Sequence, residues 1–158
     1  MKTPIFQCGY LHTDDTPARM LKPDNGKTVE VRMWAYEAAE PNAPPYIIYD
    51  FSVDHKYEHP VNFMKNFRMY LDDPNIKIDN NSGERAIRKV VIGKKNWMFV
   101  GSPKAGESMA ILYSFVQSCR AINIDPHKNL MDVFKRLNSH PHKNLTELLP
   151  VQWKITNN

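Results

Sequence analysis

The chain has 158 residues, 42% of them hydrophobic and 24% charged, with a formal net charge of +4 and a pI near 9.0. These values favour one globular domain with a substantial core, and the mild positive charge permits nucleic acid as a partner without requiring it. The longest apolar run, Met109 to Val116, is too short to cross a bilayer, and Met1 to Tyr10 lacks the apolar region of a signal peptide. Cys8 and Cys119 form no CxxC motif, so two reduced thiols in the cytoplasm are expected.

The first half of the chain is expected to form strands. Ile5 to His12 is predicted as a strand that ends at Thr13-Asp14-Asp15, and Thr28 to Tyr36 alternates apolar and polar residues. The turn-forming residues 22–26 separate these segments, which predicts a hairpin. A short apolar strand at Tyr46 to Phe51 is expected to be central in the sheet.

The second half is expected to be helical. Pro60 can begin a helix that reaches Leu71, a second helix is expected near Asn81, and residues 90–100 contain strand-like segments that leave their structure open. A further helix is predicted over Met109 to Ile122, and its expected inner face is Leu112, Phe115, Val116, Cys119 and Ile122.

The last long helix should begin at Asp125-Pro126, a capping residue followed by a first-position proline. Its predicted inner face is Leu130, Val133, Phe134 and Leu137. A short helical turn is expected at 146–149 in the tail. Three strands followed by helices indicate an α/β or α+β fold with a thin sheet.

One acidic residue, Glu84, precedes a strip of bases in the segment that begins IDNNSGERAIR at Ile78. The bases are Arg85, Arg88, Lys89, Lys94, Lys95 and Lys104. A carboxylate beside such a strip suits metal-assisted chemistry on a nucleic acid backbone, because the acid can hold a divalent ion while the bases hold phosphates.

Simpler interpretations stand beside this one. Asn81 can cap the helix and make Glu84 its third residue, which is a capping-box arrangement. Asp14 and Asp15 follow a predicted strand, where acids can hold metal ions, yet Asp-Asp-Thr-Pro is also ordinary turn composition. The cluster Trp97-Met98-Phe99 beside two lysines can stack bases or pack in the core, and core packing is the commoner explanation. No zinc, P-loop, dinucleotide or serine-hydrolase motif occurs.

Four segments resemble the insertion sequence 66 transposase family of bacteria. They are HTDDTP (12–17), EHPVNFMKNFRMYL (58–71), IDNNSGERAIRKVVIGKKNWMFVGS (78–102) and HPHKNLTELLPVQW (140–153). The resemblance implies a ribonuclease-H-like catalytic core that cuts and joins DNA at transposon ends with three acids and two Mg²⁺ or Mn²⁺ ions. By motif, Asp14 corresponds to the first acid and Glu84 to the third, and both are the expected metal ligands.

The second acid of the family has no counterpart in this sequence. Leu71 leads almost at once into Asp72-Asp73-Pro74, so an in-frame deletion near 71–76 is expected, together with absence of the family's N-terminal portion. Asp72 or Asp73 can replace the missing acid only if the fold places one of them beside Asp14. The resulting expectation is a partial core over residues 1–105 and a helical C-terminal element over 106–153.

The sequence therefore predicts a truncated transposase that is inactive alone in strand cleavage. DNA backbone contacts are assigned by charge and position to Arg85, Arg88, Lys89, Lys94 and Lys95. One alternative is a non-enzymatic DNA-binding protein that interferes with an intact transposase copy by sharing its DNA or its oligomer. The other is a decayed product without a stable fold, because a lost strand exposes a sheet edge.

Overall fold

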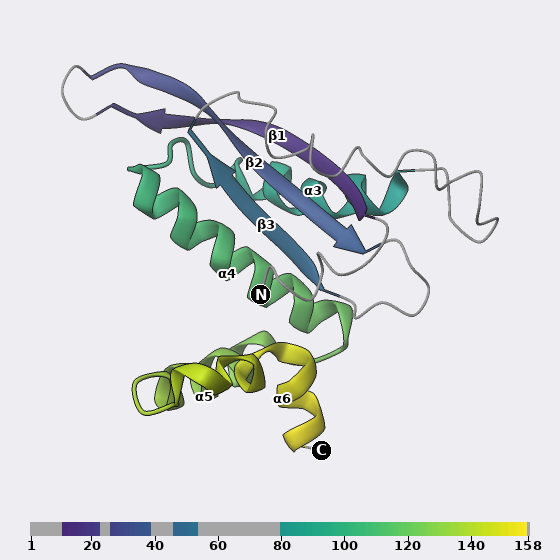
Figure 1. Cartoon of the computed structure of the whole chain (residues 1–158). Coiled ribbons are helices and arrows are strands. Elements are labelled where there is room, and N and C mark those ends of the chain that lie inside the picture. Colours follow the sequence, from purple (N-terminus) through teal and green to yellow (C-terminus); the bar gives the residue numbers. More distant parts are fainter. Residues whose placement is uncertain (1–10, 23–25, 39–45, 54–79, 158) are drawn as a thin grey trace.

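The computed structural model describes residues 11–22, 26–38, 46–53 and 80–157, which form an α+β arrangement of a three-stranded antiparallel sheet and a set of helices (Figure 1). The strands are β1 (Leu11–Leu21), β2 (Thr28–Ala38) and β3 (Ile47–Ser52). The helices are α3 (Asn81–Gly93), α4 (Pro103–Ala121), α5 (Pro126–Leu137), the 3-10 helix η2 (His142–Leu148) and α6 (Pro150–Asn157).

The strand order is β1-β2-β3, so the predicted hairpin between the first two strands is confirmed. The strand at Tyr46 to Phe51 is also found, as β3, but the prediction that it is central is wrong because β2 holds that position. Its apolar composition reflects burial of Ile48, Tyr49 and Phe51, which neighbouring segments cover even at the sheet edge.

The first strand differs most from expectation. Asp14 and Asp15 lie in the middle of β1, where they pair with Ala35 and Trp34, and do not form the predicted turn. The turn-like composition is tolerated because the backbone of every second residue in an edge strand points away from its partner. Pro17 occupies such a position, so its missing N–H removes no bond to β2.

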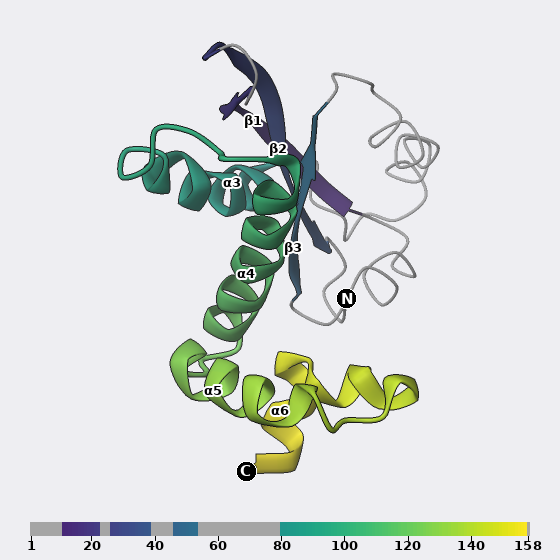
Figure 2. The same ribbon diagram turned by 90° about the vertical axis from the view of Figure 1, so that its left-hand side faces the viewer.

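One face of the sheet forms the main core with α3 and α4, which lie on the same side of the strands in Figure 2. Alternating residues of the three strands point to that face, as the period of two in a strand requires. Its buried members are Ala18, Met20, Val31, Met33, Ala35, Tyr49, Phe51, Ala86, Ile87, Val90, Val100 and Ala110.

Helix α4 approaches β3 through a stripe of small residues. Gly106, Ala110, Ser114 and Ser118 recur every four positions and are buried, whereas Leu112, expected on the inner face, is 46% exposed. The Ser114 hydroxyl accepts a hydrogen bond from the Tyr49 N–H at 2.8 Å, and the Ser118 hydroxyl accepts one from the Ile47 N–H at 3.1 Å. Small side chains therefore let α4 come close enough for its serine hydroxyls to accept hydrogen bonds from the outer edge of β3.

The C-terminal helices confirm the predicted capping but not the predicted inner face. Asp125 caps α5 by accepting a hydrogen bond from the His127 N–H at 2.9 Å, and Pro126 begins the helix. Val133 is buried, whereas Phe134 is 57% and Leu137 is 44% exposed. After α5 in the sequence, the tail forms η2 and α6 in place of the single expected turn.

Some predictions fall outside the described residues: most of the strand Ile5 to His12, the helix from Pro60 to Leu71, and the acids Asp72 and Asp73. Within the described part of the chain, no helix is long and apolar enough to cross a membrane.

Replacement of Gly106 by alanine tests the close approach of α4 to β3. A Cβ at this position would lie 2.5 Å from the Phe51 ring, and the buried ring has little room to move. The strain should outweigh the better helix propensity of alanine and lower the free energy of unfolding by about 1–2 kcal/mol, measured by urea denaturation. Gly101→Ala is the control, since a Cβ there meets nothing within 4 Å, and an equal loss in both variants would contradict the close-approach account.

Candidate functional site

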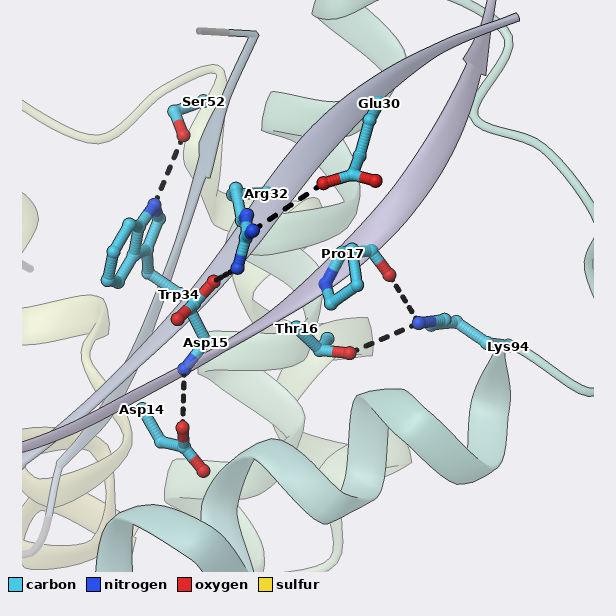
Figure 3. A network of polar contacts seen from close by, with 9 residues as sticks. All are labelled: Asp14, Asp15, Thr16, Pro17, Glu30, Arg32, Trp34, Ser52 and Lys94. Atoms are coloured by element: carbon cyan, nitrogen blue, oxygen red, sulfur yellow. Dashed lines mark hydrogen bonds and ion pairs between the residues drawn. The ribbon is translucent and has the colours of Figure 1, made fainter. Parts of the chain in front are cut away.

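Helix α3 is attached to the outer edge of β1 at both of its ends. Near the first end, the Asn80 side-chain amide donates a hydrogen bond to the Thr13 carbonyl oxygen at 3.1 Å. Just past the other end, the Lys94 ammonium donates to the Thr16 hydroxyl at 3.1 Å and also to the Pro17 carbonyl oxygen (Figure 3). These contacts fix the helix that carries Glu84 against the strand that carries Asp14.

Other backbone groups on the outer edge of β1 are hydrogen-bonded by Asp14 and Val100. The Asp15 N–H donates to the Asp14 carboxylate at 2.8 Å. Val100 makes a short parallel bridge, donating its N–H to the Arg19 carbonyl oxygen at 2.7 Å and accepting from the Leu21 N–H at 2.9 Å. The strand-like look of residues 90–100 therefore corresponds to the end of α3, a turn, and this one bridge.

The start of α3 differs from the predicted capping box by one residue. Asn80, not Asn81, occupies the cap position, and its side chain makes no capping bond because it reaches β1. Glu84 is therefore the fourth helical residue, and its N–H donates to the Asn80 carbonyl oxygen at 3.0 Å. Gly83 makes room for this arrangement, since a Cβ there would lie 2.7 Å from the Asn80 side-chain oxygen.

Asp14 and Glu84 are close enough to interact through their charges. Burial is the largest cause that raises the pKa of Asp14, and the negative charges of Asp15 and Glu84 raise it further, against a lowering by the Asp15 N–H. Asp15 itself points to Arg32, with which it forms an ion pair at 2.5 Å (Figure 3). The structure thus brings together the two acids predicted from sequence and directs the third nearby acid elsewhere.

The donor set suits one hard divalent ion better than two. Two carboxylates supply oxygen ligands of the kind that Mg²⁺ or Mn²⁺ accepts alongside water. No group of three or more His, Cys, Asp or Glu side chains able to hold a metal occurs among the described residues. The negative charge of Glu84 adds to the burial that raises the pKa of Asp14, and a bound cation would neutralise both carboxylates.

The predicted DNA contacts divide into two sets. Arg85, Arg88, Lys89 and Lys95 are exposed, and two of them, Arg85 and Arg88, line a hollow of about 390 Å³ together with Glu84. Lys94 is occupied by its bonds to β1, a structural role that charge alone did not reveal. The assignment of these bases to DNA backbone contacts stays a prediction.

Two further features bear on the sequence analysis. Burial raises the pKa of Glu37 on β2, while the nearby charge of Arg85 lowers it, so Arg85 faces a carboxylate as well as the hollow. In the cluster Trp97-Met98-Phe99, Trp97 packs against the core, as the simpler interpretation expects, whereas Met98 is 76% and Phe99 38% exposed. The sequence analysis missed the contact of Asn80 with β1, because an Asn at the start of a helix normally predicts a capping residue.

Family models match nearly the whole chain. The model described as Transposase IS66 family matches residues 1–71 and 64–108, and the model described as IS66 C-terminal element matches residues 114–151. No solved structure matches the chain.

Curated relatives match over shorter stretches. The chain is 37% identical over 99 residues to uncharacterized protein y4hP of Sinorhizobium fredii (strain NBRC 101917 / NGR234), which covers 60% of this chain and 18% of that protein. It is 39% identical over 87 residues to uncharacterized protein y4jD of the same organism, covering 54% and 17% respectively. The chain therefore spans less than a fifth of the length of these relatives.

The pH dependence of stability tests the environment of Asp14. Its folded pKa lies above the ordinary value of 3.8, so the folded state carries an unfavourable charge once the pH exceeds both values. Asp14→Asn should therefore raise the melting temperature near pH 7, and the gain should shrink as the pH falls through the folded pKa and vanish below 3.8.

Circular dichroism melts between about pH 3 and about pH 8 measure this difference. Asp15→Asn is the matched control, because it removes the same group from the neighbouring position but breaks the ion pair with Arg32 and should not stabilise the chain. A gain from Asp14→Asn that is independent of pH would refute the electrostatic account.

Proposed function

The chain belongs to the IS66 transposase family, and we propose that it is a DNA-binding partial catalytic core that holds two of the family's three metal-binding acids. Asp14 on β1 and Glu84 on α3 are these acids, and the exposed bases on and just after α3 contact the DNA backbone. The observation that carries the proposal is the attachment of α3 to β1, which holds the two carboxylates within electrostatic range and puts Glu84 in a hollow with Arg85 and Arg88.

The proposed core is ribonuclease-H-like, over residues 1–105, with a helical C-terminal element over 106–153. An antiparallel three-stranded sheet with the first acid on its first strand and helices on one face is consistent with such a core. The match of the C-terminal element to residues 114–151 supports the second boundary.

We attribute the missing acid to an internal deletion near residues 71–76. The family model matches this chain in two segments, and residues 64–71 belong to both. A deletion between two similar phrases leaves this pattern, since the surviving phrase aligns with both originals. The strand that carries the second acid in the family would lie in the deleted part.

Two acids limit what the site can do. A full set of ions would activate water or a 3′-hydroxyl and stabilise the leaving oxygen of a phosphodiester. In this chain Asp14 and Glu84 can orient one Mg²⁺ or Mn²⁺ and the α3 bases can position a phosphate, but a site for two ions lacks its third acid. We therefore propose that the chain alone binds DNA without cleaving it.

A second candidate is a non-enzymatic protein that interferes with an intact transposase copy. The observation in its favour is that Arg88 and Lys95 are exposed and have no ion-pair partner within the described part of the chain. Backbone binding through such cations requires no metal, whereas the first proposal requires Asp14 and Glu84 to share one.

Metal binding is tested by thermal unfolding with and without Mn²⁺. The native chain should melt cooperatively and at a higher temperature in Mn²⁺, because an ion that binds only the folded state stabilises it. Asp14→Asn and Glu84→Gln should each abolish the increase. Asp15→Asn should retain it, since that carboxylate is paired with Arg32. Loss of the increase in all three variants, or no increase in the native chain, would favour the metal-free candidate.

DNA binding is tested by fluorescence anisotropy with a labelled duplex at several salt concentrations. The slope of log affinity against log salt is negative, and each phosphate contact removed should reduce its magnitude by about 0.9. Arg88→Gln with Lys95→Gln should therefore reduce it by about 1.8. The charge-matched control is Lys128→Gln with Lys135→Gln on α5, which should leave the slope unchanged. Equal effects of both pairs would mean that α3 is not the DNA-binding element.

A further inference from the structure

A second hollow, of about 410 Å³, lies between the last turns of α3 and the C-terminal half of α4. It shares no residue with the hollow that holds Glu84. Its described lining includes Lys89, Leu112, Tyr113, Val116, Gln117 and Arg120. We call it the α3–α4 groove, and its volume is within the usual range for small-ligand sites.

The charge of the α3–α4 groove is positive at its rim. Lys89 from α3 and Arg120 from α4 are both exposed, and neither has an ion-pair partner among the residues that the structure describes. No acidic side chain belongs to the described lining. Two cations from different helices with no carboxylate between them suit a phosphate, which Arg can hold through paired N–H groups.

The polar group inside the groove is the amide of Gln117. The residue is only 6% exposed and its side chain makes no hydrogen bond within the described part of the chain, but its amide atoms still reach solvent at the groove. Its neighbours on α4, Ser114 and Ser118, are used by the backbone of β3, whereas Gln117 offers one acceptor and two donors to a ligand.

The remaining lining is apolar and partly open. Leu112 is 46% exposed, and Val116 lies one turn further along α4. Tyr113 packs its ring against Tyr49 at a centroid distance of 5.5 Å, and a Cβ at Gly93 would overlap its hydroxyl. The glycine therefore keeps this side of the groove open, and the aliphatic side chains provide a surface for a flat apolar ring.

We propose that the α3–α4 groove holds one unpaired nucleotide of a DNA strand. The phosphate lies between Lys89 and Arg120, the base lies against Leu112 and Val116, and the Gln117 amide bonds the edge of the base, which presents both donors and acceptors. A base stacked within a duplex cannot enter, so the groove selects a strand end or overhang. This inference rests on the proposed function, because it refines which part of the DNA the chain recognises.

The test compares a blunt duplex with the same duplex carrying a short single-stranded overhang, by fluorescence anisotropy at one salt concentration. The native chain should bind the overhang roughly tenfold more tightly, as one well-placed amide–base pair provides. Gln117→Leu should reduce that preference to about twofold or less while the affinity for the blunt duplex stays unchanged. Lys95→Gln, which lies outside the groove, should weaken both complexes equally.

If the Gln117→Leu variant does not fold, a second variant and an NMR measurement on the native chain still test the groove. Gln117→Glu preserves the size of the side chain and should repel the phosphate. The side-chain amide signal of Gln117 in ¹⁵N NMR spectra should shift when the dinucleotide dTpT is added. Blunt-duplex binding without an overhang preference, or an amide signal moved by an acidic peptide but not by dTpT, would overturn this inference and leave the proposed function standing. Absence of all DNA binding, with dTpT still shifting the amide, would instead overturn the proposed function.

Discussion

Backbone groups on the two outer edges of a three-stranded sheet need hydrogen-bond partners, and helix side chains supply them here. On β3, backbone N–H groups donate hydrogen bonds to Ser114 and Ser118 of α4. On β1, backbone carbonyl groups accept hydrogen bonds from Asn80 and Lys94 at the ends of α3. Each helix is thereby held at a fixed place over the sheet by polar contacts in addition to apolar packing. The approach of Glu84 to Asp14 follows from this requirement, because the Asn80 contact lies beside Asp14 on the strand.

Contacts of this kind also protect the sheet edge that the sequence analysis expected to be exposed. A sheet edge that has lost its neighbouring strand invites pairing with another chain. On β1, Pro17 offers no N–H, the Asp15 N–H is bonded by Asp14, and Val100 pairs with the last residues. Asp50 repeats the device on β3 by accepting from the Phe51 N–H at 3.0 Å. Asp14 therefore has a structural task that is independent of the proposed metal site, because one of its carboxylate oxygens covers this edge by accepting from the Asp15 N–H.

Sequence patterns predicted the elements whose signals are local. The hairpin, the strand β3 and the Asp125 cap follow from alternation, turn residues and a capping dipeptide, and the long DNN-to-KNW motif indicated the family. The failures have tertiary causes. The composition of Asp14 to Pro17 is that of a turn, and only the edge position of β1 makes it a strand. The inner face of α4 is a stripe of small residues, which a search for large apolar side chains overlooks, and Lys94 was assigned by charge although its ammonium bonds the sheet.

The two attachment points of α3 also restrict its position on the sheet. Thr13 and Pro17 are separated by roughly 13 Å of extended strand, whereas the chain from Asn80 to Lys94 rises by roughly 21 Å as helix. The long Lys94 side chain spans part of this difference, and the two contacts together limit how far α3 can shift along β1. Helix α4 packs along β3, and the two helices run in clearly different directions in Figure 2. The α3–α4 groove lies where the two helices separate, so substitutions that keep both contacts of α3 with β1 and the packing of α4 on β3 should keep this opening.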